Sequence, residues 1–294
     1  MTAQFTEQLD IFTSRPTDSE VRVHLSDMSQ GQFRAFHGSL RGPRCGKAKT
    51  LPADFVVDRC ECKPNASQST SCLVTEPCYW TFELPMLYDL TLQLELSDGN
   101  TATWRQAIGL RRWEIHGRDF FLEGKRVVLR GAVVDECVAD LLPQAAEAEI
   151  ALVVREPGDD FLERASELGV PLVVDLRGFA GPLTQRLLRY AWHPAVVLVL
   201  MDDEVKGGYH QPPSVRVGYV CDAARGLAQP DWADVIVFEL APGQRPPAWA
   251  ATCAKPVIAI RRPGAYAELA EARRGCDRLQ AELAPQFDLT GYFV

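Results

Sequence analysis

The sequence lacks any apolar run long enough to cross a membrane. The longest, residues 195–201, ends at Asp202, whereas a membrane helix needs about 20 apolar residues. It also lacks a long run of Lys or Arg, and its formal net charge is −8, so nucleic acid is not an expected partner. The first residues, MTAQFTEQLDIF, contain no basic region followed by an apolar core. We therefore expect no signal peptide, no membrane segment and a cytoplasmic protein.

Several catalytic signatures are missing as well. The sequence contains no nucleophile elbow, no phosphate-binding glycine loop and no histidine pair at metal-ligand spacing. The nine cysteines are odd in number and irregularly spaced, which indicates free thiols in a reducing compartment. We expect no metal site and no cofactor. Arg outnumbers Lys and Ala is abundant, which is typical of a bacterial protein from a GC-rich genome.

The first part of the chain has the pattern of an antiparallel β-sandwich. Short runs with period-two alternation are separated by Gly-, Ser- and Asn-rich turns. In residues 90–96 four leucines share one face of the expected strand, and Thr91, Gln93 and Glu95 share the other. We predict an immunoglobulin-like sandwich domain over residues 1–112.

The pattern changes in residues 113–136. Two short strands with polar turns lead into a nearly unbroken apolar run, residues 127–134. It lacks alternation and is typical of a strand buried on both faces. Beyond it, strand-like runs alternate with helical patterns, which indicates parallel strands. Residues 214–227 are expected to be helical, with Ser214 as N-cap, and the fifth strand has the weakest signal. We predict a (β/α)8 TIM-type barrel over residues 113–294, in preference to a doubly wound sheet. It must be trimmed, because such barrels usually need about 250 residues.

Four segments of the second part carry a resemblance to a known family. They are residues 121–131 (FLEGKRVVLRG), 161–175 (FLERASELGVPLVVD), 193–204 (HPAVVLVLMDDE) and 255–260 (KPVIAI). In this order, behind a sandwich, they resemble the first, third, fourth and seventh barrel strands of glycoside hydrolase family 2. Residues 76–90, in which Trp80, Pro85 and Tyr88 match, resemble a segment of that family's immunoglobulin-like domain.

The resemblance implies two catalytic positions. It places the acid/base on Glu204, after an Asp203 that stands where the family has an Asn contacting the sugar 2-hydroxyl. The nucleophile position is occupied by Arg261, and a guanidinium cannot attack an anomeric carbon. In the first-strand motif Asp135 replaces a His. The other residues expected to bind at the barrel mouth are Asp202, Arg130, Asp135, Glu136, Asp175 and Glu239.

These departures favour a catalytically degenerate family 2-like protein, a pseudoenzyme that serves as a carbohydrate-binding or structural module. In that interpretation Asp202, Asp203 and Glu204 pair with Arg130, Arg261 and Arg262. One alternative is an active retaining β-glycosidase that keeps Glu204 and uses Asp175 or Glu239 as a relocated nucleophile. Another is a protein-interaction scaffold that uses an unpaired strand edge. The expected partners are a carbohydrate or another protein.

Overall fold

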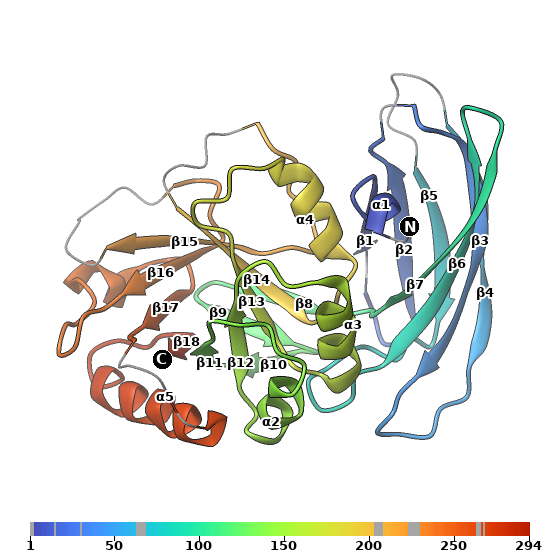
Figure 1. Ribbon diagram of the computed structural model, residues 1–294. Coiled ribbons are helices and arrows are strands. Elements are labelled where there is room, and N and C mark those ends of the chain that lie inside the picture. Colours follow the sequence, from blue (N-terminus) through green and yellow to red (C-terminus); the bar gives the residue numbers. More distant parts are fainter. Residues whose placement is uncertain are drawn as a thin grey trace. The chain divides into compact units, whose positions relative to one another are not determined.

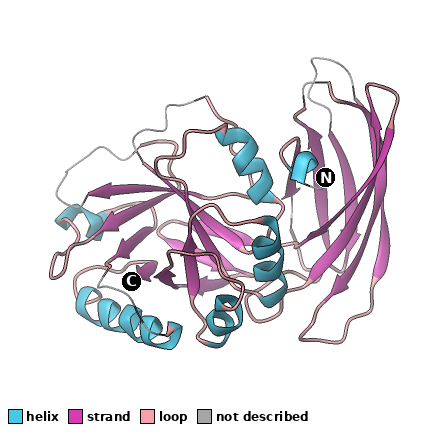
Figure 2. Ribbon diagram, viewed as in Figure 1, coloured by secondary structure: helices cyan, strands magenta, loops and turns pink. Residues whose placement is uncertain are grey.

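The computed structural model forms two compact units (Figures 1 and 2). The first comprises Met1–Arg111, Ala180–Pro194 and Gly208–Val215, and the second comprises Arg112–Phe179, Ala195–Gly207 and Arg216–Val294. Two segments of the second half of the chain thus belong to the first unit, whereas the sequence predicts a single boundary after residue 112. The structure describes residues 3–14, 16–29, 31–62, 69–202, 208–222, 230–262, 266 and 268–294.

The first unit contains two antiparallel sheets. One has the order β1 (Leu9–Ser14), β2 (Glu20–Asp27) and β5 (Ser69–Thr75). The other has the order β4 (Ala53–Glu61), β3 (Phe33–Arg44), β6 (Leu87–Leu96) and β7 (Thr101–Ile108). Along β6, Leu90, Leu92 and Leu94 are buried while Gln93 is exposed, as the alternation predicted. The sandwich-like arrangement is confirmed.

Two helices complete this unit: α1 (Ala3–Thr6) and α4 (Leu183–Ala191). Just beyond α4, Trp192 is part of the apolar cluster of this unit and only 1% exposed. Its Nε1 donates hydrogen bonds of 3.1 Å to the carbonyls of Thr6 and Leu9. Its ring packs edge-on against Trp104, with centroids 4.7 Å apart. Trp192 therefore helps to anchor helix α4, which also packs against β1 and α1, to the sandwich.

The second unit begins with a small sheet of β8 (Trp113–His116), β9 (Asp119–Leu122) and β10 (Lys125–Val127). Eight strands then close into a barrel in sequence order, and every neighbouring pair is parallel. They are β11 (Leu129–Val133), β12 (Ala151–Val154), β13 (Leu172–Asp175), β14 (Val196–Met201), β15 (Val217–Asp222), β16 (Val235–Glu239), β17 (Val257–Ile260) and β18 (Gly291–Phe293).

Helices lie between several of these strands: α2 (Leu141–Glu147), α3 (Asp159–Leu168), the short 3-10 helix η1 (Ala248–Thr252) and α5 (Leu269–Leu283). Helix α3 starts with Asp159 and Asp160, which suit a helix N-terminus, and ends at Gly169 with φ of 76°. Helix α5 packs against β11 and β18. None of the described helices is long and apolar enough to cross a membrane.

Two local expectations were wrong. Residues 217–222, predicted to be helical, form the fifth barrel strand β15, and residues 223–227 lie outside the described part. Val215, Val217 and Tyr219 alternate with period two, and β-branched and aromatic residues favour a strand. The apolar run 127–134 is divided, since β10 ends at Val127 and β11 begins at Leu129. The barrel closes, and no strand is missing from it.

We predict that Trp192→Ala lowers the free energy of unfolding of the first unit by about 3–5 kcal/mol, because it leaves a cavity among buried aromatic rings. Trp192→Phe keeps most of the apolar volume but removes the donor to Thr6 and Leu9, and should destabilise by about 1–2 kcal/mol. Denaturant unfolding followed by tryptophan fluorescence measures both. Equal stability of Trp192→Ala and the parent would contradict the assigned role.

Candidate functional site

The carboxyl ends of parallel barrel strands lie at one end of the barrel, which we call the barrel mouth. Asp175 is the last residue of β13, and Glu239 is the last residue of β16. These strands are separated by β14 and β15 in the closed barrel, so the two carboxylates come from strands that are not neighbours. Among the described residues, Asp175 and Glu239 are the two predicted site residues that share an ion-pair partner.

Arg177 joins these two carboxylates. Its Nε and Nη2 donate to Oδ1 and Oδ2 of Asp175 at 2.8 and 2.7 Å. Its Nη1 lies 3.0 Å from Oε2 of Glu239. The Arg177 backbone N–H also donates to Oδ1 of Asp175, at 3.1 Å. One guanidinium therefore forms a fork on Asp175 and reaches across the mouth to Glu239.

Two further arginines extend this arrangement. Arg155 lies 3.5 Å from Oδ2 of Asp175, and Arg262 lies 3.4 Å from Oε1 of Glu239. We call the five residues Arg155, Asp175, Arg177, Glu239 and Arg262 the mouth network. It contains three guanidinium groups and two carboxylates, so its own charges are nearly balanced without any ligand.

The protonation of Asp175 follows from its surroundings. Its side chain is only 3% exposed, and burial by itself raises the pKa of a carboxyl group. The hydrogen bonds and positive charge of Arg177 outweigh burial, so the pKa of Asp175 lies below its ordinary value. Hydrogen bonding to Asp175 raises the pKa of the Arg177 guanidinium. The buried pair therefore stays ionised at neutral pH.

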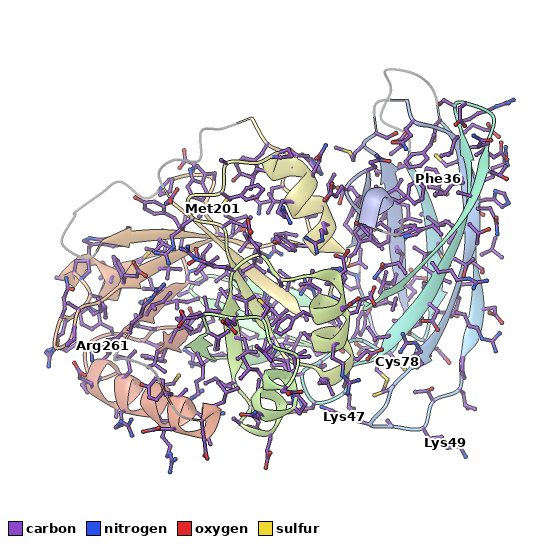
Figure 3. The ribbon with its side chains drawn as sticks, viewed as in Figure 1. Phe36, Lys47, Lys49, Cys78, Met201 and Arg261 are labelled. Atoms are coloured by element: carbon purple, nitrogen blue, oxygen red, sulfur yellow. The ribbon has the colours of Figure 1, made fainter. Side chains whose placement is uncertain are left out.

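Arg261 does not belong to the mouth network. Its Nη1 lies 2.5 Å from Oε2 of Glu282, on α5, and its Nη2 donates to the carbonyl of Gln244 at 2.6 Å. Glu282 lies in the last turn of α5, and Figure 3 shows Arg261 near that end of the helix. Arg130 likewise turns to α5, where its Nε and Nη2 donate to Asp277 and Gln280 at 2.7 and 2.6 Å. Both arginines thus tie the barrel to a helix.

The other predicted site residues do not belong to the mouth network as far as the structure describes them. Asp202 follows β14 directly and is partly exposed, and Asp203 and Glu204 lie outside the described residues. Asp135 and Glu136 follow β11 and are exposed. Among the described residues, Arg130, Arg261 and Arg262 pair with Asp277, Glu282 and Glu239, respectively. The part of the expected pairing that involves Asp203 and Glu204 lies outside the described residues.

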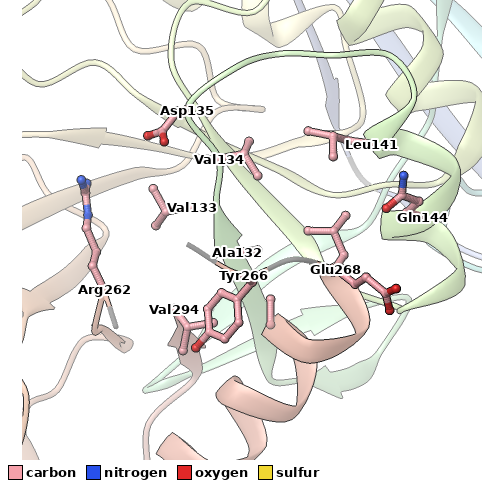
Figure 4. Close-up of a pocket in the computed structure, with 12 residues that line it drawn as sticks. Ala132, Val133, Val134, Asp135, Leu141, Gln144, Arg262, Tyr266, Glu268 and Val294 are labelled. Carbon is pink, nitrogen blue, oxygen red and sulfur yellow. The ribbon is translucent and has the colours of Figure 1, made fainter. Parts of the chain in front are cut away.

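The residue that the sequence interpretation missed is Arg177. The sequence did offer one signal for it, because Arg177 lies two residues after Asp175. An Asp side chain readily accepts a hydrogen bond from the backbone N–H two residues later, so the pattern predicts that these two residues lie together. The residues also missed, Gln144, Tyr266 and Glu268, line a pocket beside β11 together with Asp135 and Arg262 (Figure 4). In the part of the chain that the structure describes, no three His, Cys, Asp or Glu side chains are grouped to hold a metal ion.

We predict that Arg177→Met lowers the free energy of unfolding by about 3 kcal/mol, because it leaves the Asp175 charge buried with a weakened counter-charge. Asp175→Asn in the same protein should recover much of this loss, since it removes that charge. Thermal or denaturant unfolding of the parent, the single variant and the double variant measures the effect. A double variant less stable than Arg177→Met would contradict the pairing.

The lowered pKa of Asp175 also predicts a pH dependence. A carboxylate whose folded-state pKa lies below its unfolded value, about 3.9, stabilises the fold fully above that value. This contribution is lost as the pH falls through the folded-state pKa. The stability difference between the parent and Asp175→Asn should therefore be constant near neutrality and shrink below about pH 4. A difference that is the same at pH 7 and pH 2 would contradict the assignment.

Comparisons with known proteins identify the fold. No protein-family model matches the sequence, and no curated protein matches it. Solved structures do match: a glycosyl hydrolase family 2 member from Bacteroides cellulosilyticus aligns over 98% of this chain with a TM-score of 0.66 and 15% identity. β-Glucuronidase 2 from Bacteroides uniformis aligns over 97% with a TM-score of 0.65 and 12% identity. The β-glucuronidase of Parabacteroides merdae aligns over 98%, at a TM-score of 0.62 and 14% identity.

The alignments cover 45%, 45% and 46% of those three proteins, so this chain spans less than half of their length. At this level of identity, the likeness concerns the fold. It extends over the sandwich sheets and the closed barrel alike. The chain therefore has the fold found in glycoside hydrolase family 2, and the resemblance inferred from its sequence motifs is confirmed.

Proposed function

We propose that this chain is a glycoside hydrolase family 2-like protein that does not hydrolyse glycosides and serves as a carbohydrate-binding or structural module. In this proposal an immunoglobulin-like sandwich, residues 1–112, precedes a shortened (β/α)8 barrel, residues 113–294. The observation that carries the proposal is the bridge that Arg177 makes between Asp175 and Glu239. It occupies both carboxylates that could take the place of the missing nucleophile.

Retaining hydrolysis requires one carboxylate as nucleophile and a second carboxyl group, about 5–5.5 Å away, that can donate a proton. Asp175 is unsuited to both roles. Its two oxygens accept from Arg177, its side chain is almost fully buried, and its lowered pKa keeps it deprotonated. An ionised carboxylate without a free oxygen can neither attack an anomeric carbon nor protonate a leaving group.

Glu239 is more accessible, with 41% of its side chain exposed. It is nevertheless shared between Arg177 and Arg262, at 3.0 and 3.4 Å. Attack on a sugar would require Glu239 to leave both guanidinium groups, and positive charge beside a carboxylate weakens it as a nucleophile. This argues against the alternative of an active glycosidase with a relocated nucleophile.

The position aligned with the family nucleophile gives independent support. Arg261 remains protonated at any working pH and has no lone pair with which to attack. Its bonds to Glu282 and Gln244 also direct its guanidinium to α5 and the loop after β16. Arg261 has the role of a structural cation in this proposal.

We predict that the purified chain releases no 4-nitrophenol from a panel of 4-nitrophenyl β-glycosides that includes glucosides, galactosides, mannosides and glucuronides. The assay compares the chain with a buffer blank over a range of protein concentrations. Turnover that rises with protein concentration and is abolished by Glu204→Gln would overturn the proposal. Turnover that survives Glu204→Gln would instead indicate a contaminating enzyme. That enzyme is then removed by further purification, and the comparison is repeated.

A further inference from the structure

The segment Gly208–Val215 belongs to the first unit, although it lies between barrel strands β14 and β15 in the sequence. We call this segment the strap. The Ser214 hydroxyl donates to the carbonyl of Ile11 on β1, at 3.2 Å, and the backbone N–H of His210 donates to Oγ1 of Thr184 on α4, at 3.0 Å. Neither bond involves a group that titrates near neutral pH, so both hold the strap independently of pH.

A further contact of the strap joins two titratable side chains. Nε2 of His210 lies 2.8 Å from Oδ2 of Asp10 on β1. The Asp10 side chain is 3% exposed and the His210 side chain is 37% exposed. Oδ1 of Asp10 is buried and has no hydrogen-bond partner among the described residues. The carboxyl group thus lies inside the protein, and the group that can neutralise its charge comes from the strap.

No other charged group replaces His210 in this role among the described residues. The alternation along β1 places Asp10 on the face of the sheet opposite the apolar cluster, to which Leu9 and Ile11 belong. Its register partner on β2, Ser26, is uncharged. His210 is the one charged group whose field shifts the pKa of Asp10. The other charged or titratable residues on and beside α1, β2, α4 and the strap are Glu7, Glu20, Arg22, His24, Asp27, Arg186, Arg189 and Tyr209.

Burial opposes a negative charge on Asp10. The pKa of Asp10 lies above its ordinary value, because the loss of hydration outweighs the hydrogen bond and charge of His210 and the backbone N–H of Ile11. Two groups at hydrogen-bond distance titrate as a pair. With one proton the pair has no net charge, whichever group carries it. Without that proton, a carboxylate is left inside the protein beside a neutral imidazole, which is costly.

Loss of the proton therefore weakens the docked strap. A carboxyl group whose pKa is raised in the docked state stabilises that state fully at low pH, and this contribution is lost as the pH rises through the raised value. The positive charge of an imidazole can then neutralise the carboxylate, but an ordinary imidazole loses its proton near about pH 6.5. The strap is thus held most firmly in mild acid and less firmly above neutrality.

We propose that the strap is a pH-sensitive element of the fold, which is docked on β1 while the Asp10–His210 pair holds a proton and is released when the pair loses it. The inference goes beyond the proposed function, since it concerns the first unit and does not depend on what the barrel mouth binds. The strap leads into β15, which begins at Val217, so its release loosens the chain segment that precedes the fifth barrel strand.

The test is amide hydrogen exchange of peptides that cover the strap, measured from about pH 5.5 to about pH 8.5 and corrected for the pH dependence of the chemical exchange rate. Over this range the protection of the parent strap should fall by about tenfold or more, which corresponds to one pKa unit between the docked and released states. His210→Gln keeps a hydrogen-bond donor that does not titrate, and Asp10→Asn removes the buried charge. In both variants the corrected protection should no longer depend on pH.

Two control variants separate this contact from a general loosening of the strap. Ser214→Ala removes the bond to Ile11 and should lower the protection equally at every pH. His24→Gln changes another histidine of the same sheet, whose ring stacks on Phe12. The pKa of His24 lies below its ordinary value, because burial and the charge of Arg22 disfavour its protonated form. This variant should therefore keep the pH dependence of the parent.

Three results would overturn the inference. The first is a parent strap with the same corrected protection at both ends of the pH range. The second is a pH dependence like that of the parent in either His210→Gln or Asp10→Asn, with folding of each variant verified by its melting temperature. The third is loss of the pH dependence in His24→Gln, which would assign the effect to the other histidine of the sheet.

Discussion

Closure of the barrel is the constraint on which the second unit depends. Strand β18 pairs with β17 on one side and with β11 on the other, so that Gly291 faces both Ile258 and Leu129 in the register. A Cβ on Gly291 would lie 2.8 Å from Ile258, and a Cβ on Gly131 would lie 2.7 Å from Phe293. The absence of a side chain at Gly291 and Gly131 therefore makes space for Ile258 and Phe293 where β18 pairs with β17 and β11 and closes the barrel. A closed sheet has no free edge, and each strand end is fixed relative to the others.

Because closure fixes the strand ends, it also fixes where charge is buried. Asp175 ends a strand whose residues are all buried, and an ionised carboxylate in such a place needs a cation. Arg177 supplies it from the same chain segment, only two residues away, and has a third guanidinium nitrogen left for Glu239. The charge balance at the mouth is thus achieved within the protein. In a glycosidase, by contrast, the catalytic carboxylates must keep free oxygens for the substrate.

The sequence predicted the architecture better than the contacts of the site. Apolar runs such as residues 196–201 and 235–238 have a strong local signal, and the order of the motifs pointed to a sandwich followed by a barrel. The fifth strand was misassigned because Ser214 resembles an N-cap, although the alternation of Val217 and Tyr219 favours a strand. The partners of Arg130 and Arg261 could not be predicted, because Asp277 and Glu282 lie far away in the sequence on α5. Which side of a strand end an arginine faces depends on the helix packed there, and no local pattern encodes that.

Arg262 connects the mouth network to the pocket beside β11, since it pairs with Glu239 and also lines the pocket. The Arg262–Glu239 pair is longer than the Arg177–Glu239 pair, 3.4 against 3.0 Å, and about half of the Arg262 side chain is exposed. Exposed ion pairs contribute little to stability, about 0–1 kcal/mol. Arg262 can therefore leave Glu239 at little cost in stability, because Glu239 keeps its bond to Arg177. Arg262 is thus held less firmly than Arg177, and it is the member of the mouth network that also lines the pocket beside β11.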